Sequence, residues 1–130
     1  MIVLDTHIWL WWINGNNDKL RPSWNQAIER SPHVGVAAIS MFEVCWLSGH
    51  GRIELAQDSQ SWIEQALLPS GIELCPLTPE ISALAVSLKE HHSDPQDRLI
   101  IATALSLDAS VISADRKFRE YPELQGKLMN

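Results

Sequence analysis

The sequence is poor in cysteine, in positive charge and in long hydrophobic runs, and each shortage excludes a class of protein. Two cysteines among 130 residues, Cys45 and Cys75, make neither a disulfide framework nor a zinc knuckle. Both lie among apolar neighbours, so we expect two small core residues in a reducing compartment. Ten lysines and arginines against sixteen acids leave a formal charge of −6, which argues against a broad, nonspecific coat of nucleic acid.

The hydrophobic runs are too short to cross a membrane. The N-terminus reads MIVLDTHIWLWWING; no basic residue precedes its apolar part and Asp5 interrupts it, which is not typical of a signal peptide. The remaining run, HIWLWWI, falls well short of the roughly 20 residues that a spanning helix needs. We expect a cytoplasmic protein without a membrane segment.

The composition is that of a folded domain. Hydrophobic residues make up 45% of the chain and charged residues 20%, which is ordinary for a soluble globular protein. No linker, repeat or low-complexity stretch interrupts the sequence. Residues 1–130 are therefore expected to form one domain, long enough to bury roughly two thirds of its unfolded surface.

Short apolar segments alternate with helical patterns along the chain. Strands are predicted at MIVLD (1–5), HVGVAAI (33–39), GIELCPL (71–77) and ASVISAD (109–115). Helices are predicted at 6–15, 41–51, 59–68, 78–91 and 95–107, most of them with a start signal. Strands separated by helices imply right-handed crossovers. The fold class is therefore α/β, a three-layer α/β/α sandwich with a mostly parallel central sheet.

Four acids fall where such a sheet binds its ligands, beyond the carboxyl ends of its strands. Asp5 ends the first strand and Asp115 ends the last. Glu43 lies one turn into the helix that follows the second strand, and Asp97 lies one turn into the buried helix 95–107. These positions place the four side chains at one edge of the sheet.

Three of these acids also have an explanation that involves no chemistry. Glu43 completes a capping box with Ser40, Asp115 can cap the turn RKFREYP, and Asp97 can complement a helix dipole. Asp5 is the hardest to explain in this way, because the next residue, a threonine, can do any capping.

The segment SDPQD at 93–97 contains two aspartates that we expect to differ. Asp94 fits a helix N-cap and Pro95 fits the first helical position, which leaves Asp97 free for another role. Removing Asp94 and the four edge acids from the charge count takes −6 to −1, since −6 + 5 = −1. The acidity of the chain is thus largely concentrated in this one region.

Carboxylates that converge repel each other, and burial raises their pKa values. A divalent cation makes such a cluster tolerable, and all-oxygen ligands select a hard ion, Mg²⁺ or Mn²⁺. Such an ion generates a hydroxide nucleophile and stabilises displacement at phosphorus. The residues therefore predict metal-dependent phosphoryl or phosphodiester chemistry.

Four segments, in order, carry a resemblance to a known family. IVLDTHIWLWW, ISMFEVCWLSGHGRIEL, HHSDPQDRLIIATAL and VISADRKFREYP resemble the PIN-domain ribonucleases, and are most similar to the VapC toxins of type II toxin–antitoxin pairs. The resemblance runs through nearly the whole chain. It implies a PIN fold and cleavage of RNA by water activated at Mg²⁺, with Mn²⁺ as a substitute.

The resemblance also assigns site residues. Asp5 and Asp97 are expected to be the principal metal ligands, with Glu43 and Asp115 completing the site directly or through water. The hydroxyls of Thr6 and Ser113 are expected to serve the metal's water shell or the scissile phosphate.

Arg98 has two readings, a pairing with Asp94 and a phosphate contact, of which we favour the pairing. Beyond the acids, Arg116, Lys117 and Arg119 are candidate phosphate contacts.

The resemblance further implies partners: inhibition by a small antitoxin from an adjacent gene with a DNA-binding pattern, and a homodimer of the chain itself. The candidate antitoxin surface consists of Trp11, Trp12, Trp46 and Leu47, because a short helix with tryptophan on more than one face needs cover on several sides.

Rival functions remain at this point. A phosphatase of the aspartyl-phosphate kind would have a second aspartate two residues after Asp5, where His7 stands instead. A non-enzymatic, receiver-like or scaffold domain could use the acids to bind metal alone. His91 and His92 suggest zinc only weakly, since no second ligand pair has matching spacing, and they are alternatively RNA contacts.

Overall fold

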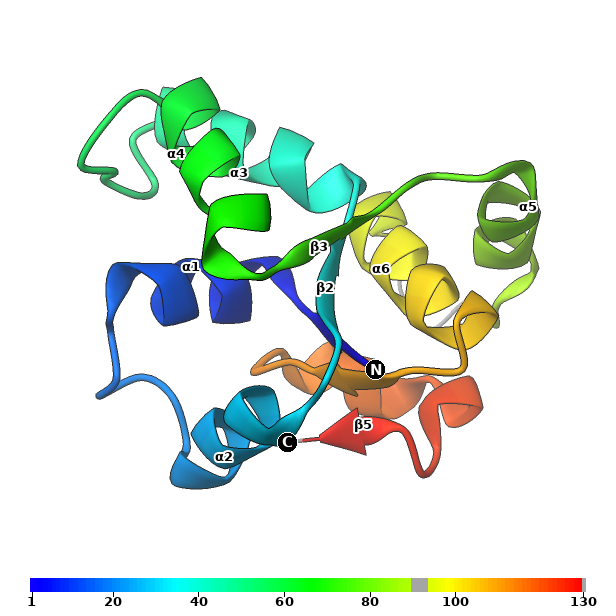
Figure 1. Ribbon diagram of the computed structural model, residues 1–130. Coiled ribbons are helices and arrows are strands. Elements are labelled where there is room, and N and C mark those ends of the chain that lie inside the picture. Colours follow the sequence, from blue (N-terminus) through cyan, green and yellow to red (C-terminus); the bar gives the residue numbers. More distant parts are fainter. Residues whose placement is uncertain (90–93, 130) are drawn as a thin grey trace.

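The computed structural model describes residues 1–89 and 94–129, and in that part of the chain five strands form one parallel sheet (Figure 1). The strands are β1 (Ile2–Leu4), β2 (Val34–Ala37), β3 (Glu73–Cys75), β4 (Ser110–Ile112) and β5 (Leu128–Met129). Their order across the sheet is β3-β2-β1-β4-β5, and every neighbouring pair is parallel. The predicted parallel sheet is confirmed, and β5 is an addition to it.

The helices lie between the strands in the chain. They are α1 (Thr6–Asn14), α2 (Pro22–Arg30), α3 (Ile39–Gly49), α4 (Ser59–Gln65), α5 (Pro79–Ser87) and α6 (Pro95–Ser106). Short 3-10 turns follow at Leu68–Ser70, Arg116–Glu120 and Pro122–Leu124. All the predicted helices are present, and α2 is one that we did not predict.

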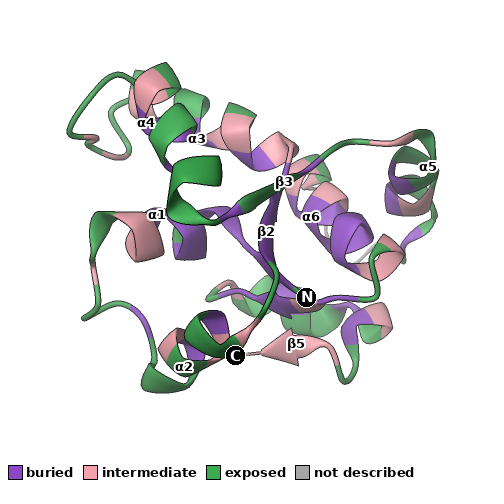
Figure 2. Ribbon diagram, viewed as in Figure 1, coloured by how far each residue is buried: buried purple, intermediate pink, exposed green. Residues whose placement is uncertain are grey.

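The central strands β1, β2 and β4 are buried on both faces because alternate side chains enter two separate cores, whereas the edge strands β3 and β5 are partly exposed. Leu4, Val36 and Ile112 pack with α1, α2, α3 and α4, whereas Val3 and Val111 pack with α6 and the turns after β4. Figure 1 shows α5 and α6 on the other side of the strands from α1, α3 and α4. Figure 2 shows that β2, in the middle of the sheet, is buried. The predicted three-layer sandwich is therefore the observed architecture.

Helix α1 is anchored by a tryptophan pair in the larger core. Trp9 is fully buried, donates from Nε1 to the Ala66 carbonyl at 3.0 Å, and meets Trp62 edge to face at 5.0 Å between ring centroids. Gly15 ends the helix in the left-handed region at φ 71°, where its N–H bonds the Trp11 carbonyl. The first turn of α1 is thereby held against the carboxyl end of β1.

Two details of the sequence analysis are wrong. Cys75 is buried as expected, but Cys45 is exposed on α3, so only one of the two cysteines is a core residue. Helix α3 begins at Ile39, with Ala38 before it and no side-chain cap, so Ser40 lies inside the helix.

Among the described residues, no helix has the length and apolar character to cross a membrane.

Candidate functional site

The register of β1 and β4 brings two polar residues together at the carboxyl end of the sheet. Leu4 pairs with Ile112, so the residues that follow, Asp5 and Ser113, lie side by side. The Asp5 N–H donates to the Ile112 carbonyl at 2.9 Å, and Ser113 Oγ donates to Asp5 Oδ2 at 2.7 Å. Ser113 Oγ also accepts from the Asp115 N–H at 3.0 Å, so one hydroxyl positions both acids.

Asp5 also caps α1. Its backbone is extended (φ −61°, ψ 156°) and its Oδ1 accepts from the Thr6 N–H at 2.7 Å. The expectation that Thr6 would supply this cap is wrong.

Thr6 instead links α1 to α3. Its Oγ1 lies 2.8 Å from both Ser40 Oγ and Glu43 Oε1. A hydroxyl has one proton, so Thr6 donates to the Glu43 carboxylate and accepts from Ser40. Glu43 therefore forms no capping box with Ser40, and its carboxylate, held by Thr6, is repelled by the charge of Asp5.

The start of α6 separates the two aspartates of SDPQD as predicted. Asp94 is the N-cap, and its Oδ1 accepts from the Gln96 N–H at 2.9 Å and from the Asp97 N–H at 3.5 Å. Pro95 is the first helical residue. The Asp97 side chain is buried, and its Oδ2 has no hydrogen-bond partner among the described residues.

These elements enclose one acidic pocket of about 280 Å³, lined by Asp5, His7, Trp11, Glu43, Asp94, Asp97, Ala114 and Asp115. All four predicted site acids contribute to it. Three of its lining residues were not among the predicted site residues: His7, Ala114 and Asp94, which was predicted only as a helix cap. The i, i+4 spacing of His7 and Trp11 on α1 is the signal that could have identified the histidine.

Burial and mutual repulsion disfavour negative charge in this pocket. Burial raises the pKa of Asp97 to about 8, with further contributions from Asp94, Asp5, Asp115 and Glu43. Burial also raises the pKa of Asp5 and of Glu43, while their hydrogen bonds from Ser113 and Thr6 oppose the rise. A cation in the pocket would relieve this repulsion.

The donor set fits a hard, hydrated cation better than a tightly caged one. Within residues 1–89 and 94–129, no three acidic, histidine or cysteine side chains gather closely enough to hold an ion together. Mg²⁺ is commonly held by one or two carboxylates and keeps several of its waters. The Oδ2 of Asp97, which has no hydrogen-bond partner in residues 1–89 and 94–129, is an oxygen atom of the type that such an ion binds.

Three predicted supporting residues are buried behind the pocket wall. Thr6 and Ser113 are 0% and 1% exposed and do not line the pocket; their hydroxyls bond the carboxylates of Glu43 and Asp5, and their contact with metal-bound water or phosphate stays a prediction. Arg98 neither pairs with Asp94 nor lines the pocket.

Arg98 closes the end of α5 instead. Its guanidinium donates to the carbonyls of Ala85 (3.0 Å), Val86 (3.2 Å), Leu88 (2.6 Å) and Lys89 (3.2 Å). The last carbonyls of a helix have no partner within it, and a buried guanidinium with a fixed fork of donors satisfies several at once.

The four predicted partner residues occupy unlike positions. Trp11 is half-buried and lines the acidic pocket, while Trp12 and Leu47 are half-buried against the larger core. Trp46 is 42% exposed on α3 and stacks on His50 at 4.0 Å between ring centroids. His91 and His92 lie outside the described residues.

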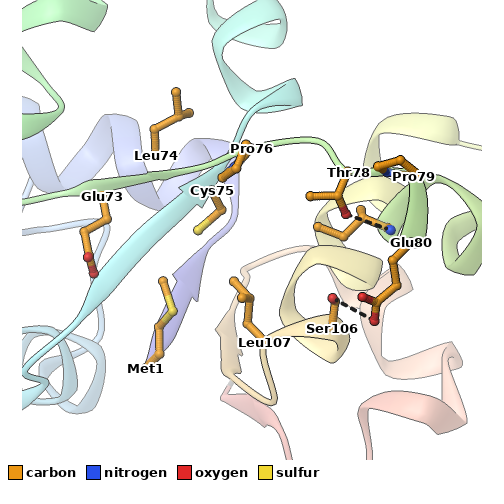
Figure 3. Close-up of a pocket in the computed structure, with 11 residues that line it drawn as sticks. Met1, Glu73, Leu74, Cys75, Pro76, Thr78, Pro79, Glu80, Ser106 and Leu107 are labelled. Atoms are coloured by element: carbon orange, nitrogen blue, oxygen red, sulfur yellow. Dashed lines mark hydrogen bonds between the residues drawn. The ribbon is translucent and has the colours of Figure 1, made fainter.

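A second hollow, of about 500 Å³, lies away from these acids (Figure 3). It is lined by Met1, Leu74 and Leu107 among others, with Thr78 and Ser106 at the α5 side. Met1 precedes β1 and Leu107 follows α6, which places this hollow toward the amino end of β1, opposite Asp5. Its carboxylates belong to Glu73 and Glu80, and Glu80 is engaged by Ser106 Oγ at 3.2 Å.

Comparison with known proteins matches the chain to one family. The model of the PIN domain matches residues 2–124. Ribonuclease VapC22 of Mycobacterium tuberculosis is 37% identical over 121 residues, which is 92% of this chain and 91% of that protein.

Solved structures share the fold. VapBC2 from Rickettsia felis, bound to a DNA fragment from its promoter, gives a TM-score of 0.72 at 20% identity and covers 100% of this chain and 98% of that one. A toxin–antitoxin complex from Klebsiella pneumoniae gives 0.65 at 19% identity, with 100% and 97% covered. The chain therefore belongs to the PIN-domain family and, within it, to the VapC ribonucleases.

Proposed function

We propose that the chain is a Mg²⁺-dependent endoribonuclease that acts as the toxin of a type II toxin–antitoxin pair. The observation that carries the proposal is the buried Oδ2 of Asp97, which lacks a hydrogen-bond partner in the described part of the chain, in a pocket walled by Asp5, Glu43, Asp94 and Asp115. The relationship to Ribonuclease VapC22 supports RNA as the substrate.

Asp97 and Asp5 would hold the ion, and Glu43 and Asp115 would orient its waters. A bound Mg²⁺ would supply an activated water and stabilise charge on the scissile phosphate. The protein's own contribution is positioning: Ser113 orients Asp5, and Thr6 orients Glu43. Buried hydrogen bonds of this kind keep the carboxylates in place before the ion and the RNA arrive.

The experiment compares two aspartates three residues apart. Asp97→Asn is nearly isosteric but lacks the charge, and we expect cleavage of single-stranded RNA in Mg²⁺ to fall more than about 100-fold, the upper end of the loss for groups that only orient a ligand. Asp94→Asn caps as well as aspartate and serves as the control, with activity retained within a few fold.

Circular dichroism of both variants serves to check that each is folded. Equal losses in the two variants would refute the assignment of Asp97. Binding of Mn²⁺ without any cleavage by the wild type would favour a non-enzymatic, receiver-like domain instead.

The antitoxin would cover the exposed apolar side chains beside the pocket. Phe42 and Trp46 are 55% and 42% exposed on α3, on either side of Glu43 in the sequence, and Trp11 lies at the pocket itself. We expect a small DNA-binding protein from the adjacent gene, whose segment folds across this surface with a basic side chain near Asp5 and Asp97. The toxin–antitoxin assemblies among the solved structures support this partner.

Co-expression with the adjacent gene product tests the partner. Four single variants should each weaken the complex while the fold persists: Trp11→Ala, Trp12→Ala, Trp46→Ala and Leu47→Ala. Unchanged affinity in all four variants would place the antitoxin elsewhere. The predicted homodimer is tested by light scattering of the toxin alone.

A further inference from the structure

A third hollow, distinct from the one near Met1, adjoins the acidic pocket and shares a wall with it. It measures about 260 Å³ and lies between the end of α1, the loop after it, and the loop after α3. His7 and Trp11 line both hollows, and their ring centroids lie 6.1 Å apart with a tilt of 57°. One turn of α1 thus presents two rings as a partition between the hollows.

The two sides of this partition have opposite charge. The acidic pocket is lined by five carboxylates, whereas the third hollow is lined by Lys19 and Arg52 with a single acid, Glu54. Lys19 Nζ lies 5.8 Å from the centre of the Trp11 ring. Both cations are exposed, and neither forms an ion pair within the part of the chain that the structure describes.

The polar lining is held in place by the fold. Asn14 lines the hollow, and its Oδ1 accepts from Trp62 Nε1 at 2.9 Å, which ties the end of α1 to the core. Trp11 is half-buried, packs against the larger core and lines both hollows. An aromatic face beside two unpaired cations is the combination that binds single-stranded nucleic acid, through base stacking and phosphate contact.

We propose that this hollow is the subsite for the nucleotide next to the scissile phosphate, an inference that rests on the proposed ribonuclease function. Its base stacks on Trp11, and Lys19 and Arg52 contact the phosphate on its far side. His7 closes the partition between this nucleotide and the acids. In a chain of net charge −6, this local positive pair draws the RNA backbone to the rim of an otherwise repulsive site.

The test measures affinity without cleavage. A fluorescein-labelled single-stranded RNA oligonucleotide is titrated in EDTA with protein carrying Asp97→Asn, and anisotropy gives the dissociation constant. Trp11→Leu should weaken binding about ten-fold, the effect of losing one base–aromatic stack, and Trp11→Phe should restore most of it. Lys19→Gln and Arg52→Gln should each lower the slope of log affinity against log salt by about 0.7, the loss of one phosphate contact to a single strand.

Arg30→Gln, an exposed cation on α2 that lines neither hollow, is the matched control and should leave both quantities unchanged. RNA affinity and salt slope equal to the parent in the Trp11, Lys19 and Arg52 variants would overturn the proposal. Loss of antitoxin binding alone in those variants would identify a protein-docking surface and overturn it as well. Failure of the ribonuclease proposal is seen separately, as absence of cleavage by the wild type in Mg²⁺.

Discussion

The strand side and the helix side of the acidic pocket hold their carboxylates in different ways. On the strand side, both oxygens of Asp5 accept hydrogen bonds, from Thr6 and from Ser113, and Asp115 accepts from the Lys117 N–H at 3.0 Å. On the helix side, Asp97 is buried as deeply as Asp5, yet its Oδ2 has no partner among the described residues. Hydrogen bonds to the charged form stabilise a buried carboxylate, and Asp97 has few of them.

The difference indicates a division of labour. The strand side holds its carboxylates with the protein's own donors, whereas the proposed cation would supply to the helix side the charge that Asp97 lacks. Burying a polar group without a partner costs free energy, and a catalytic role or a bound ion is one explanation for such a group. Four predictions test this contrast.

The largest expected effect is on the pH dependence of stability without metal. The folded pKa of Asp97 is raised from 3.8 to about 8, so the native state binds the proton more tightly than the unfolded state. The free energy of unfolding should fall as pH rises between these values, by up to about 1.4 kcal/mol per pH unit. Asp97→Asn has no such charge and should become increasingly more stable than the wild type from pH 5 to pH 8.

Urea denaturation in EDTA at several pH values measures this difference. If the free energies of unfolding of the two proteins changed in parallel with pH across that range, the pKa of Asp97 would not be raised in the folded state. In that case the helix side of the pocket would resemble the strand side.

The next effect concerns Arg98, which anchors the helix side. Arg98→Met removes the donors from two buried carbonyl bonds at the end of α5, those of Ala85 and Leu88, and from two that are partly buried, and we expect a loss of about 3 kcal/mol in the free energy of unfolding. Arg98→Lys should recover part of it, because an ammonium lacks the fork that reaches several carbonyls. Arg116→Met, at an exposed site, is the control for loss of charge, and a matching loss there would contradict this role.

Metal should then stabilise the folded state through Asp97. With free Mn²⁺ 100-fold above its dissociation constant, the wild type should gain about 2.7 kcal/mol. The gain should be largely absent in Asp97→Asn, and thermal melts at matched ionic strength detect it. The same shift in both proteins would mean that the ion binds elsewhere.

The smallest effect on stability is expected at Ser113, on the strand side. Ser113→Ala removes the donor to Asp5 and the acceptor for the Asp115 N–H, at a cost of about 1 kcal/mol. Cleavage should fall about 10- to 100-fold, as for other groups that orient a metal ligand. Ser110→Ala, at the start of the same strand and outside the network, should change neither quantity.

The strand pattern and the positions of the acids were readable because they follow simple periodicities. Runs such as Ile2–Leu4 and Val34–Ala37 are buried on both faces and stand out as apolar, and parallel strands direct their ends to one edge. Asp94 and Asp97 were distinguished because an N-cap followed by proline has a strong local signature. Local rules therefore placed all four carboxylates at the pocket.

What could not be read depends on long-range contacts. Ser40 and Glu43 have the spacing of a capping box, but Thr6, far away in the chain, takes the contact with both. The partners of Arg98 are backbone carbonyls, which have no residue type to reveal them. Strand β5 has two residues, too few for an alternation, and α2 was missed although Trp24 and Ile28 stand one turn apart behind Pro22.

The hydrogen bond between Asp5 and Ser113 spans 108 positions of the chain and has a consequence for biosynthesis. Ribosomes release a chain from its N-terminus, and β1 can meet β2 long before β4 exists. Asp5 gains its neighbours Ser113 and Asp115 only when β4 has emerged from the exit tunnel and inserted beside β1. A nascent polypeptide of this protein therefore carries no assembled acidic pocket until residues 110–115 have left the ribosome, and the ribosome that makes it is not exposed to a finished nuclease before that point.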